Sequence, residues 1–179
     1  MSLKQSLCVF LLLASAAACA SPKVGYDYDS SANFNGYHTY DWVADTQEVT
    51  GDKRLDNTLV DGRIRHAIGT QLRVKGYTAS MNKRPDFYVA YHLRIKDMMK
   101  GASTQNYIGD YVHGTFTTIS DIQPYKEGTL LIDIVDATSQ QLVWRGSALT
   151  EVDPGMTPEE RNKRISNIVH AMFVHFPPQ

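Results

Sequence analysis

A run of apolar and small residues near the start of the chain limits which residues are available to fold. Lys4 is the only charge before this run, which continues unbroken from Leu7 to Ala18. A membrane-spanning helix needs about 20 apolar residues, so a run this short has the shape of a secretory leader that is later removed. We therefore predict a signal peptide over residues 1–18 and a single folded domain over residues 24–179.

Cys19 follows the small residues directly. Residues 16–19 resemble the lipobox, at which bacteria lipidate a cysteine thiol and then cleave the chain before it, although Ala16 stands where that box usually has leucine. Cys8 would leave with the leader, so the mature chain would keep Cys19 alone and could form no internal disulfide. We predict lipid attachment at Cys19, with acyl chains such as palmitate, and a tether over residues 19–23 that anchors the protein to a membrane.

The residue after the cysteine bears on where the anchor lies. Ala20 is not the aspartate that, by general resemblance, holds lipoproteins at the inner membrane. We therefore expect the inner leaflet of the outer membrane, with the domain facing the periplasm. Ordinary cleavage after Ala18 or Ala20 is the alternative, and it would release a soluble periplasmic protein.

Two kinds of pattern predict the secondary structure. Aromatic, β-branched and alternating residues predict strands over 24–28, 37–42 and 87–96, and a β-hairpin of 130–134 with 142–148. Apolar residues at helical spacing predict one helix from Val60 to Leu72, ended by Gly76, and a second that starts at the capping box of Thr157 and carries an apolar stripe as far as Phe176. These elements predict an α+β fold, a two-layer sandwich in which a mainly antiparallel sheet carries both helices on one face.

Residues 97–126 do not fit this pattern. The segment is polar and contains glycine and threonine, with a short strand expected near residues 115–119. It is long for a connection in a compact domain, and long loops are often functional or mobile. We expect a flexible β-excursion, with a ligand-gating or partner-binding loop as the alternative.

The sequence contains no recognised catalytic or metal-binding motif. Its six histidines belong to no ligand pattern such as His-Glu-x-x-His, and no nucleophile elbow or phosphate-binding glycine loop is present. With 18 basic and 19 acidic side chains, the chain offers no excess of positive charge for nucleic acid. We expect no catalytic residue of a known class, no metal, no cofactor and no nucleic-acid partner.

One group of polar residues is a candidate surface site. If the predicted strands are neighbours, their alternation places His92, Arg94, Asp133 and Arg145 on the sheet face opposite the helices. Asp133 and Arg145 would then lie opposite or diagonal to each other across the hairpin. A structural cross-strand ion pair is one interpretation, and an exposed polar groove or a subunit interface is the other.

Several short segments are typical of one family. They are Tyr26-Asp27-Tyr28-Asp29, Lys75-Gly76-Tyr77, Arg84-Pro85-Asp86-Phe87, Val143-Trp144-Arg145-Gly146 and Phe176-Pro177-Pro178. Together they resemble the bacterial lipoprotein family catalogued as domain of unknown function 4136, over nearly the whole mature chain. The resemblance implies a periplasm-facing α+β lipoprotein and no particular reaction.

These observations favour a noncatalytic envelope lipoprotein that binds a protein partner or a small ligand and is attached to the membrane through its lipid. The alternative is a periplasmic enzyme of unfamiliar type, with a polar pocket on the open sheet face that gathers groups such as His92, Asp133 and Arg145. A third hypothesis is a self-associating structural protein, which a large apolar patch on the open sheet face would favour.

Overall fold

The computed structural model describes residues 22–43, 52–53, 55–81, 84–108 and 115–178. The predicted signal peptide and Cys19 lie outside these residues, as does most of the tether. Six strands form one sheet in the order β1-β6-β5-β4-β2-β3. They are β1 (Lys23–Tyr28), β2 (Thr39–Trp42), β3 (Thr78–Ala79), β4 (Phe87–Ile108), β5 (Thr115–Asp136) and β6 (Leu142–Glu151).

The sheet is mainly antiparallel, as the sequence predicts. β1, β6, β5 and β4 pair antiparallel in turn, whereas β2 lies parallel to both β4 and β3. The predicted hairpin of β5 and β6 turns at Asp136, whose carboxylate accepts hydrogen bonds from the backbone N–H groups of Thr138 and Ser139 at 2.9 and 2.6 Å. This is the turn chemistry expected of aspartate.

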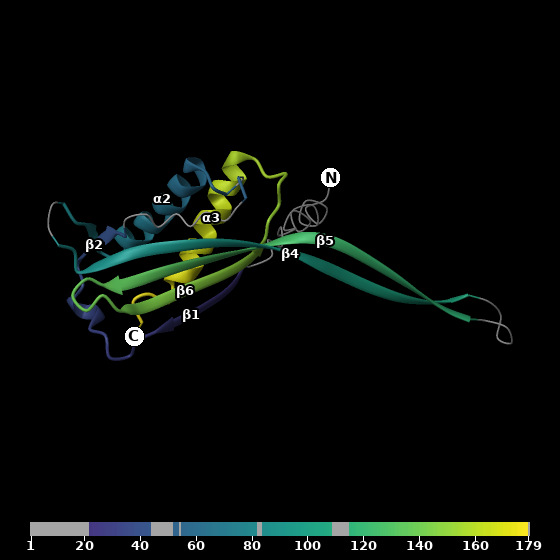
Figure 1. Ribbon diagram of the computed structural model, residues 1–179, viewed down its shortest axis with the longest axis horizontal. Coiled ribbons are helices and arrows are strands. Elements are labelled where there is room, and N and C mark those ends of the chain that lie inside the picture. Colours follow the sequence, from purple (N-terminus) through teal and green to yellow (C-terminus); the bar gives the residue numbers. More distant parts are fainter. Residues whose placement is uncertain (1–21, 44–51, 54, 82–83, 109–114, 179) are drawn as a thin grey trace, which may run out of the picture.

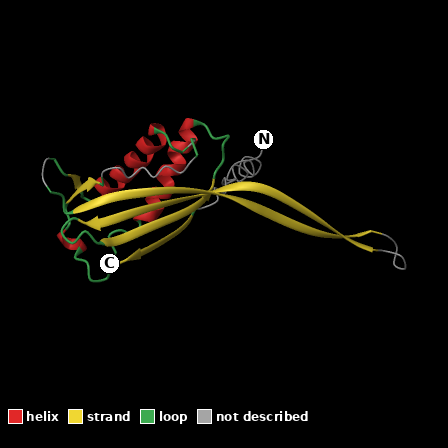
Figure 2. Ribbon diagram, viewed as in Figure 1, coloured by secondary structure: helices red, strands yellow, loops and turns green. Residues whose placement is uncertain are grey.

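Both helices cover the same face of the sheet, which confirms the predicted two-layer sandwich (Figures 1 and 2). The side chain of Asn57 caps α2 (Thr58–Val74), and Gly76, at φ +91°, lies in the turn after it. The capping box of Thr157 and Glu160 starts α3 (Pro158–Phe173) as predicted. Among the described residues, no helix is long and apolar enough to cross a membrane.

The core lies between the helices and the sheet and is rich in aromatic rings. Trp144 of β6 is fully buried, with its ring centroid 5.8 Å from that of Phe173 and 5.1 Å from that of Phe176. The predicted apolar stripe extends beyond the helix, because α3 ends at Phe173 while Phe176 is buried in the turn that follows. Gly146 makes room for the tryptophan, since a Cβ there would lie 2.5 Å from the indole ring.

The segment over residues 97–126, expected to be a flexible β-excursion with a short strand near residues 115–119, continues β4 and β5 as two longer strands. Their antiparallel register runs on without a break from Asp97 opposite Lys126 to Ile108 opposite Thr115. We call this part, residues 97–108 and 115–126, the arm; it projects as a two-stranded ribbon from one end of the sheet (Figure 1). At the base of the arm, residues 97–101 and 122–124 are all exposed, so the sequence there need not alternate between polar and apolar residues, and the pattern that reveals a half-buried strand is missing.

Candidate functional site

The structure places the predicted polar residues on the open face of the sheet. Asp133 lies directly opposite Arg145 in the register of β5 and β6. The Arg145 Nε and Nη2 atoms donate to the two carboxylate oxygens of Asp133 at 2.6 and 2.5 Å. The Nε2 atom of His92, on β4, lies 3.6 Å from the Asp133 Oδ2 atom. Three of the four residues therefore meet, and the carboxylate at their centre is 6% exposed.

The chemistry of this cluster is dominated by the bidentate pair. The hydrogen bond to Asp133 raises the pKa of Arg145 above its usual value. Each carboxylate oxygen accepts a charge-assisted hydrogen bond, so Asp133 is held as an acceptor and is poorly placed to act as a general base. Arg94 lies farther along β4, opposite Thr129, and is exposed. It joins His92 and Arg145 only as part of the wall of a shallow groove of about 380 Å³.

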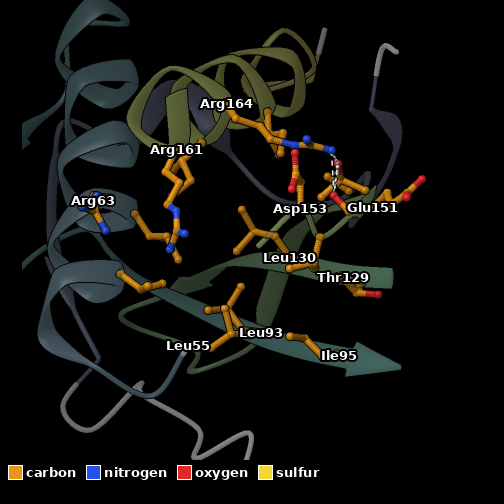
Figure 3. A pocket seen from close by; sticks show the side chains of 18 of the residues that line it. Leu55, Arg63, Leu93, Ile95, Thr129, Leu130, Glu151, Asp153, Arg161 and Arg164 are labelled. Atoms are coloured by element: carbon orange, nitrogen blue, oxygen red, sulfur yellow. Dashed lines mark hydrogen bonds between the residues drawn. The ribbon is translucent and has the colours of Figure 1, made fainter. Parts of the chain in front are cut away.

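A different hollow, which the sequence did not predict, lies between the helices and the sheet. This cavity has a volume of about 270 Å³, near the lower end of the range of roughly 300 to 1,000 Å³ typical of small-ligand pockets. Its inner wall is apolar: α2 and α3 contribute one side, and the three central strands contribute the other. These apolar residues are Val60 and Ile64 of α2, Ile165 and Ile168 of α3, and Leu93, Leu130 and Ala148 of the sheet. Figure 3 shows Leu93 and Leu130 on the sheet side of the cavity.

Three arginines from the helices border the cavity (Figure 3). Arg63 of α2 donates through Nε to the Asn162 side-chain oxygen at 2.7 Å, which links the two helices. Arg161 donates to the carbonyl oxygens of Met156 and Pro154, both at 3.0 Å. Arg164 donates to the hydroxyl of Thr150 at 2.5 Å and to the carbonyl of Glu151 at 2.7 Å. The arginines thus position the connection between β6 and α3.

The charge of the cavity wall is unbalanced. Three arginines, Arg63, Arg161 and Arg164, border the cavity from the helices, against the two carboxylates of Glu151 and Asp153. The hydrogen bonds described for Arg63, Arg161 and Arg164 all go to uncharged acceptors. A guanidinium that is already positioned and has N–H groups in a fixed fork suits a carboxylate or phosphate group. An apolar interior with a positive border therefore fits a ligand with a hydrocarbon part and an anionic head.

The cavity lies close to the point where the described chain begins. Pro22 and Lys23 line a neighbouring hollow whose wall also includes Thr150, Asp153 and Arg164. Thr150, Asp153 and Arg164 also line the cavity, so the two hollows share one wall. Strand β1 begins beside this wall, since Lys23 lies opposite Leu149 in the register. The described part of the chain therefore begins at the cavity end of the sheet.

The sequence contained a signal for this cavity that the periodicity alone does not isolate. Arg161 and Arg164 fall at i and i+3, next to Ile165 and Ile168 on the adjoining apolar stripe. A helix face that changes from apolar to basic at one end can simply be exposed to solvent there. It indicates a ligand site only once the position of the sheet opposite it is known. In the part of the chain that the structure describes, no three or more His, Cys, Asp or Glu side chains are grouped as a metal site.

Residues 24–178 match the family described as a domain of unknown function (DUF4136), in agreement with the motif resemblance. No curated protein matches the chain. Among solved structures, a PDZ domain protein from Parabacteroides distasonis is similar at a TM-score of 0.53 and 12% identity. That similarity covers 87% of this chain but 35% of the other, so this chain spans about a third of that protein's length. At this identity the likeness concerns the fold alone.

The PelC dodecamer from Paraburkholderia phytofirmans gives a TM-score of 0.46 at 7% identity, covering 85% of this chain and 94% of that one. A neuraminyllactose-binding hemagglutinin homolog from Helicobacter pylori gives a TM-score of 0.34 at 11% identity, over 83% of this chain and 87% of that one.

Proposed function

The chain belongs to the family described as a domain of unknown function (DUF4136), which brings no activity with it, and from the geometry of its cavity we propose a noncatalytic envelope lipoprotein that binds an amphiphilic ligand. The ligand class is a hydrocarbon chain with a carboxylate or phosphate head. The hydrocarbon part would occupy the cavity between helices and sheet, and the head would lie against the arginines at its border.

The observation that carries this proposal is the combination of an apolar interior and a positive border in one cavity. Burial of a hydrocarbon chain stabilises a complex by about 0.8 kcal/mol for each methylene group removed from water. Charge-assisted hydrogen bonds from Arg63 or Arg161 would add orientation, because the planar guanidinium donates to the oxygens of a carboxylate or phosphate in a fixed geometry. Neither property alone distinguishes a ligand site from a gap in the core.

We further propose that the domain is attached through lipid on Cys19 to the inner leaflet of the outer membrane and faces the periplasm. The lipobox resemblance and Ala20 support this location. The position of Pro22 and Lys23 beside the shared wall supports a cavity that faces the tether, and thus a membrane from which an amphiphile can be taken.

The anchor is tested by intact mass and membrane fractionation of the native protein and of a Cys19→Ala variant. We expect an acyl mass on the native protein and its loss, together with membrane attachment, in the variant. A Cys8→Ala variant is the matched control, because that thiol lies in the predicted leader and its removal should change neither result. A soluble, unmodified native protein would exclude the lipoprotein hypothesis while leaving ligand binding open.

The cavity is tested by titrating the Cys19→Ala chain with dodecanoate and, as a neutral-head comparison, with dodecanol. Leu93→Trp places an indole in the cavity, so we expect it to abolish binding of both probes, whereas Leu93→Met conserves volume and should retain binding. Bound probe should raise the thermal unfolding midpoint by mass action, which gives a second readout. Equal binding by the Leu93→Trp and Leu93→Met variants would place the probe elsewhere.

The arginine border is tested separately. Arg63→Gln removes a charge and keeps an amide that can donate to Asn162. We expect weaker binding of dodecanoate and unchanged binding of dodecanol. Lys163→Gln serves as the control. It removes an exposed charge from α3, next to Asn162, at a residue that does not belong to the cavity wall. An equal loss for both probes would show that Arg63 acts through the helix packing and not on the head group.

A second function has one observation in its favour, which is the meeting of His92, Asp133 and Arg145 beside the open-face groove. The alternative is an enzyme of unfamiliar type acting there. The bidentate pairing of the Asp133 carboxylate with Arg145 argues for a structural role instead, and a loss of cellular function in an Arg94→Gln variant with unchanged stability would favour the groove.

A further inference from the structure

The arm leaves two strand edges without a neighbour. Strand β6 pairs with β5 only as far as Glu127, and β2 pairs with β4 only at its first residues, up to Val89. Among the described strands, the arm has therefore no third member along its whole length. Its outward N–H and C=O groups form two ready templates for strand pairing.

The two halves of the arm differ in how these edges are protected. Lysines stand at and near its base, at positions 96, 100 and 126, and Pro124 interrupts the donors of β5 there. Charged side chains and proline are the usual means of preventing edge-to-edge association. In the outer half, residues 101–108 and 115–122, in which Gly101 lies opposite Ile122, the sequence contains in contrast a single charged residue, Asp121, and no lysine or proline. Threonine, phenylalanine and isoleucine at residues 115–119 favour a strand, and the open edges of the outer half lack the lysine and proline found at the base.

An isolated two-stranded ribbon is marginally stable in water, and three or more strands are needed for independent stability. We propose that the outer half of the arm pairs edge to edge with the arm of a second copy of this chain. Two arms joined antiparallel would form a four-stranded sheet in which each ribbon supplies the neighbour that the other lacks. The contact would be isologous, with the same segment contributed by both copies.

A second copy is the occupant that the observations favour. It presents an edge of the same length and the same low charge, so the approach of the two outer halves brings little like-charge repulsion. The lysines at the base would stop the pairing from extending toward the body, which limits the contact to the outer half. The inference is independent of the proposed ligand, because none of the arm residues with described side chains, 97–101 and 122–126, lines the helix–sheet cavity.

The test measures the protein mass of the native full chain by size-exclusion chromatography with light scattering, over a wide dilution series. A Thr104→Lys, Thr117→Lys double variant adds one lysine to each strand of the outer half. A Met99→Lys, Gln123→Lys double variant adds the same charge to the inner half and is the matched control. We expect a dimer or larger assembly for the native chain and the control, and a monomer for the outer-half variant.

Three results would overturn the inference: a native chain that is monomeric at every concentration, an assembly that survives the outer-half lysines, or a mass explained by a different protein bound to the arm. The thermal unfolding midpoint of the body distinguishes loss of pairing from misfolding, because the core cluster of the described residues is built from the helices and the body strands. A chain in which a two-residue turn replaces residues 97–126 must also be monomeric.

Discussion

Strands β4 and β5 run through two regions of the molecule, and these regions are held together differently. In the body, the side chains that face the helices are almost fully buried: Phe87 and Val89 are 0% exposed and Tyr91 is 2% exposed. In the arm, Met99 is 76% exposed and Ile122 is 59% exposed. The backbone ladder is the same in both regions. The unbroken ladder therefore shows that backbone pairing alone can extend a strand. Burial of side chains under the helices determines which part of the two strands contributes to the stability of the fold.

The largest expected difference between body and arm lies in the cost of removing an apolar side chain. We expect Trp144→Ala to lower the free energy of unfolding by about 3 to 5 kcal/mol, because it empties the centre of the aromatic core. Met99→Ala, in the arm, should change it by less than about 0.5 kcal/mol. Denaturant titration of both variants measures the contrast, and similar losses would mean that the arm packs on the core.

Ion pairs give a second, smaller contrast. We expect Arg145→Met to lower the free energy of unfolding by about 1 to 3 kcal/mol, because it leaves the Asp133 carboxylate buried without its bidentate partner; half of the arginine is solvent-accessible, which reduces the loss. Lys126 and Asp97, at the base of the arm, are only 2.6 Å apart but exposed. Asp97→Asn should therefore cost at most about 1 kcal/mol.

A double variant with Asp133→Asn and Arg145→Met refines this test. Asparagine removes the buried charge, so part of the stability lost in Arg145→Met should return in the same denaturant titration. If the double variant is less stable than Arg145→Met, the carboxylate has another stabilising partner, and His92 is the nearest candidate.

The dependence of stability on acidic pH should also arise in the body. Backbone N–H donation from His38, and further hydrogen bonds from Thr39, hold the pKa of Asp86 below its usual value. A carboxyl group whose pKa is lower in the folded state contributes stability above its unfolded pKa, near 3.9, and loses it as the pH falls through the folded pKa. We expect Asp86→Asn to be less stable than the native chain at neutral pH, with the difference shrinking below about pH 4. A difference independent of pH would mean that the charge of Asp86 is not what binds β2 to β4.

The contrast between body and arm also explains what the sequence could predict. The three central strands and both helices of the body each bury one face, so alternation in β4, β5 and β6 and the helical stripe ending in Met172 and Phe173 identify them. The ion pair of Asp133 and Arg145 follows from the same alternation once the hairpin is recognised. At the base of the arm, residues 97–101 and 122–124 are all exposed, so no alternation marks them, and the extension of the arm depends on pairing between its two strands. The cavity depends on the distance between layers, which no single segment encodes.

The smallest effect is expected from removing the arm itself. Replacement of residues 97–126 by a two-residue turn joins Lys96 to Glu127, which are already opposite each other in the register. The loss of exposed ladder bonds and the gain from closing a shorter loop are each modest, so we expect the stability of the body to change by less than about 1 kcal/mol. Hydrogen exchange of the backbone amides should show the same difference between arm and body. Arm amides in the monomeric outer-half lysine variant should exchange fast, and those of the β5–β6 hairpin slowly. In the native chain the outer-half amides should become protected if two arms pair. A body that unfolds when the arm is replaced would show that β4 and β5 need their full length to find their register, and the arm would then be part of the folding unit.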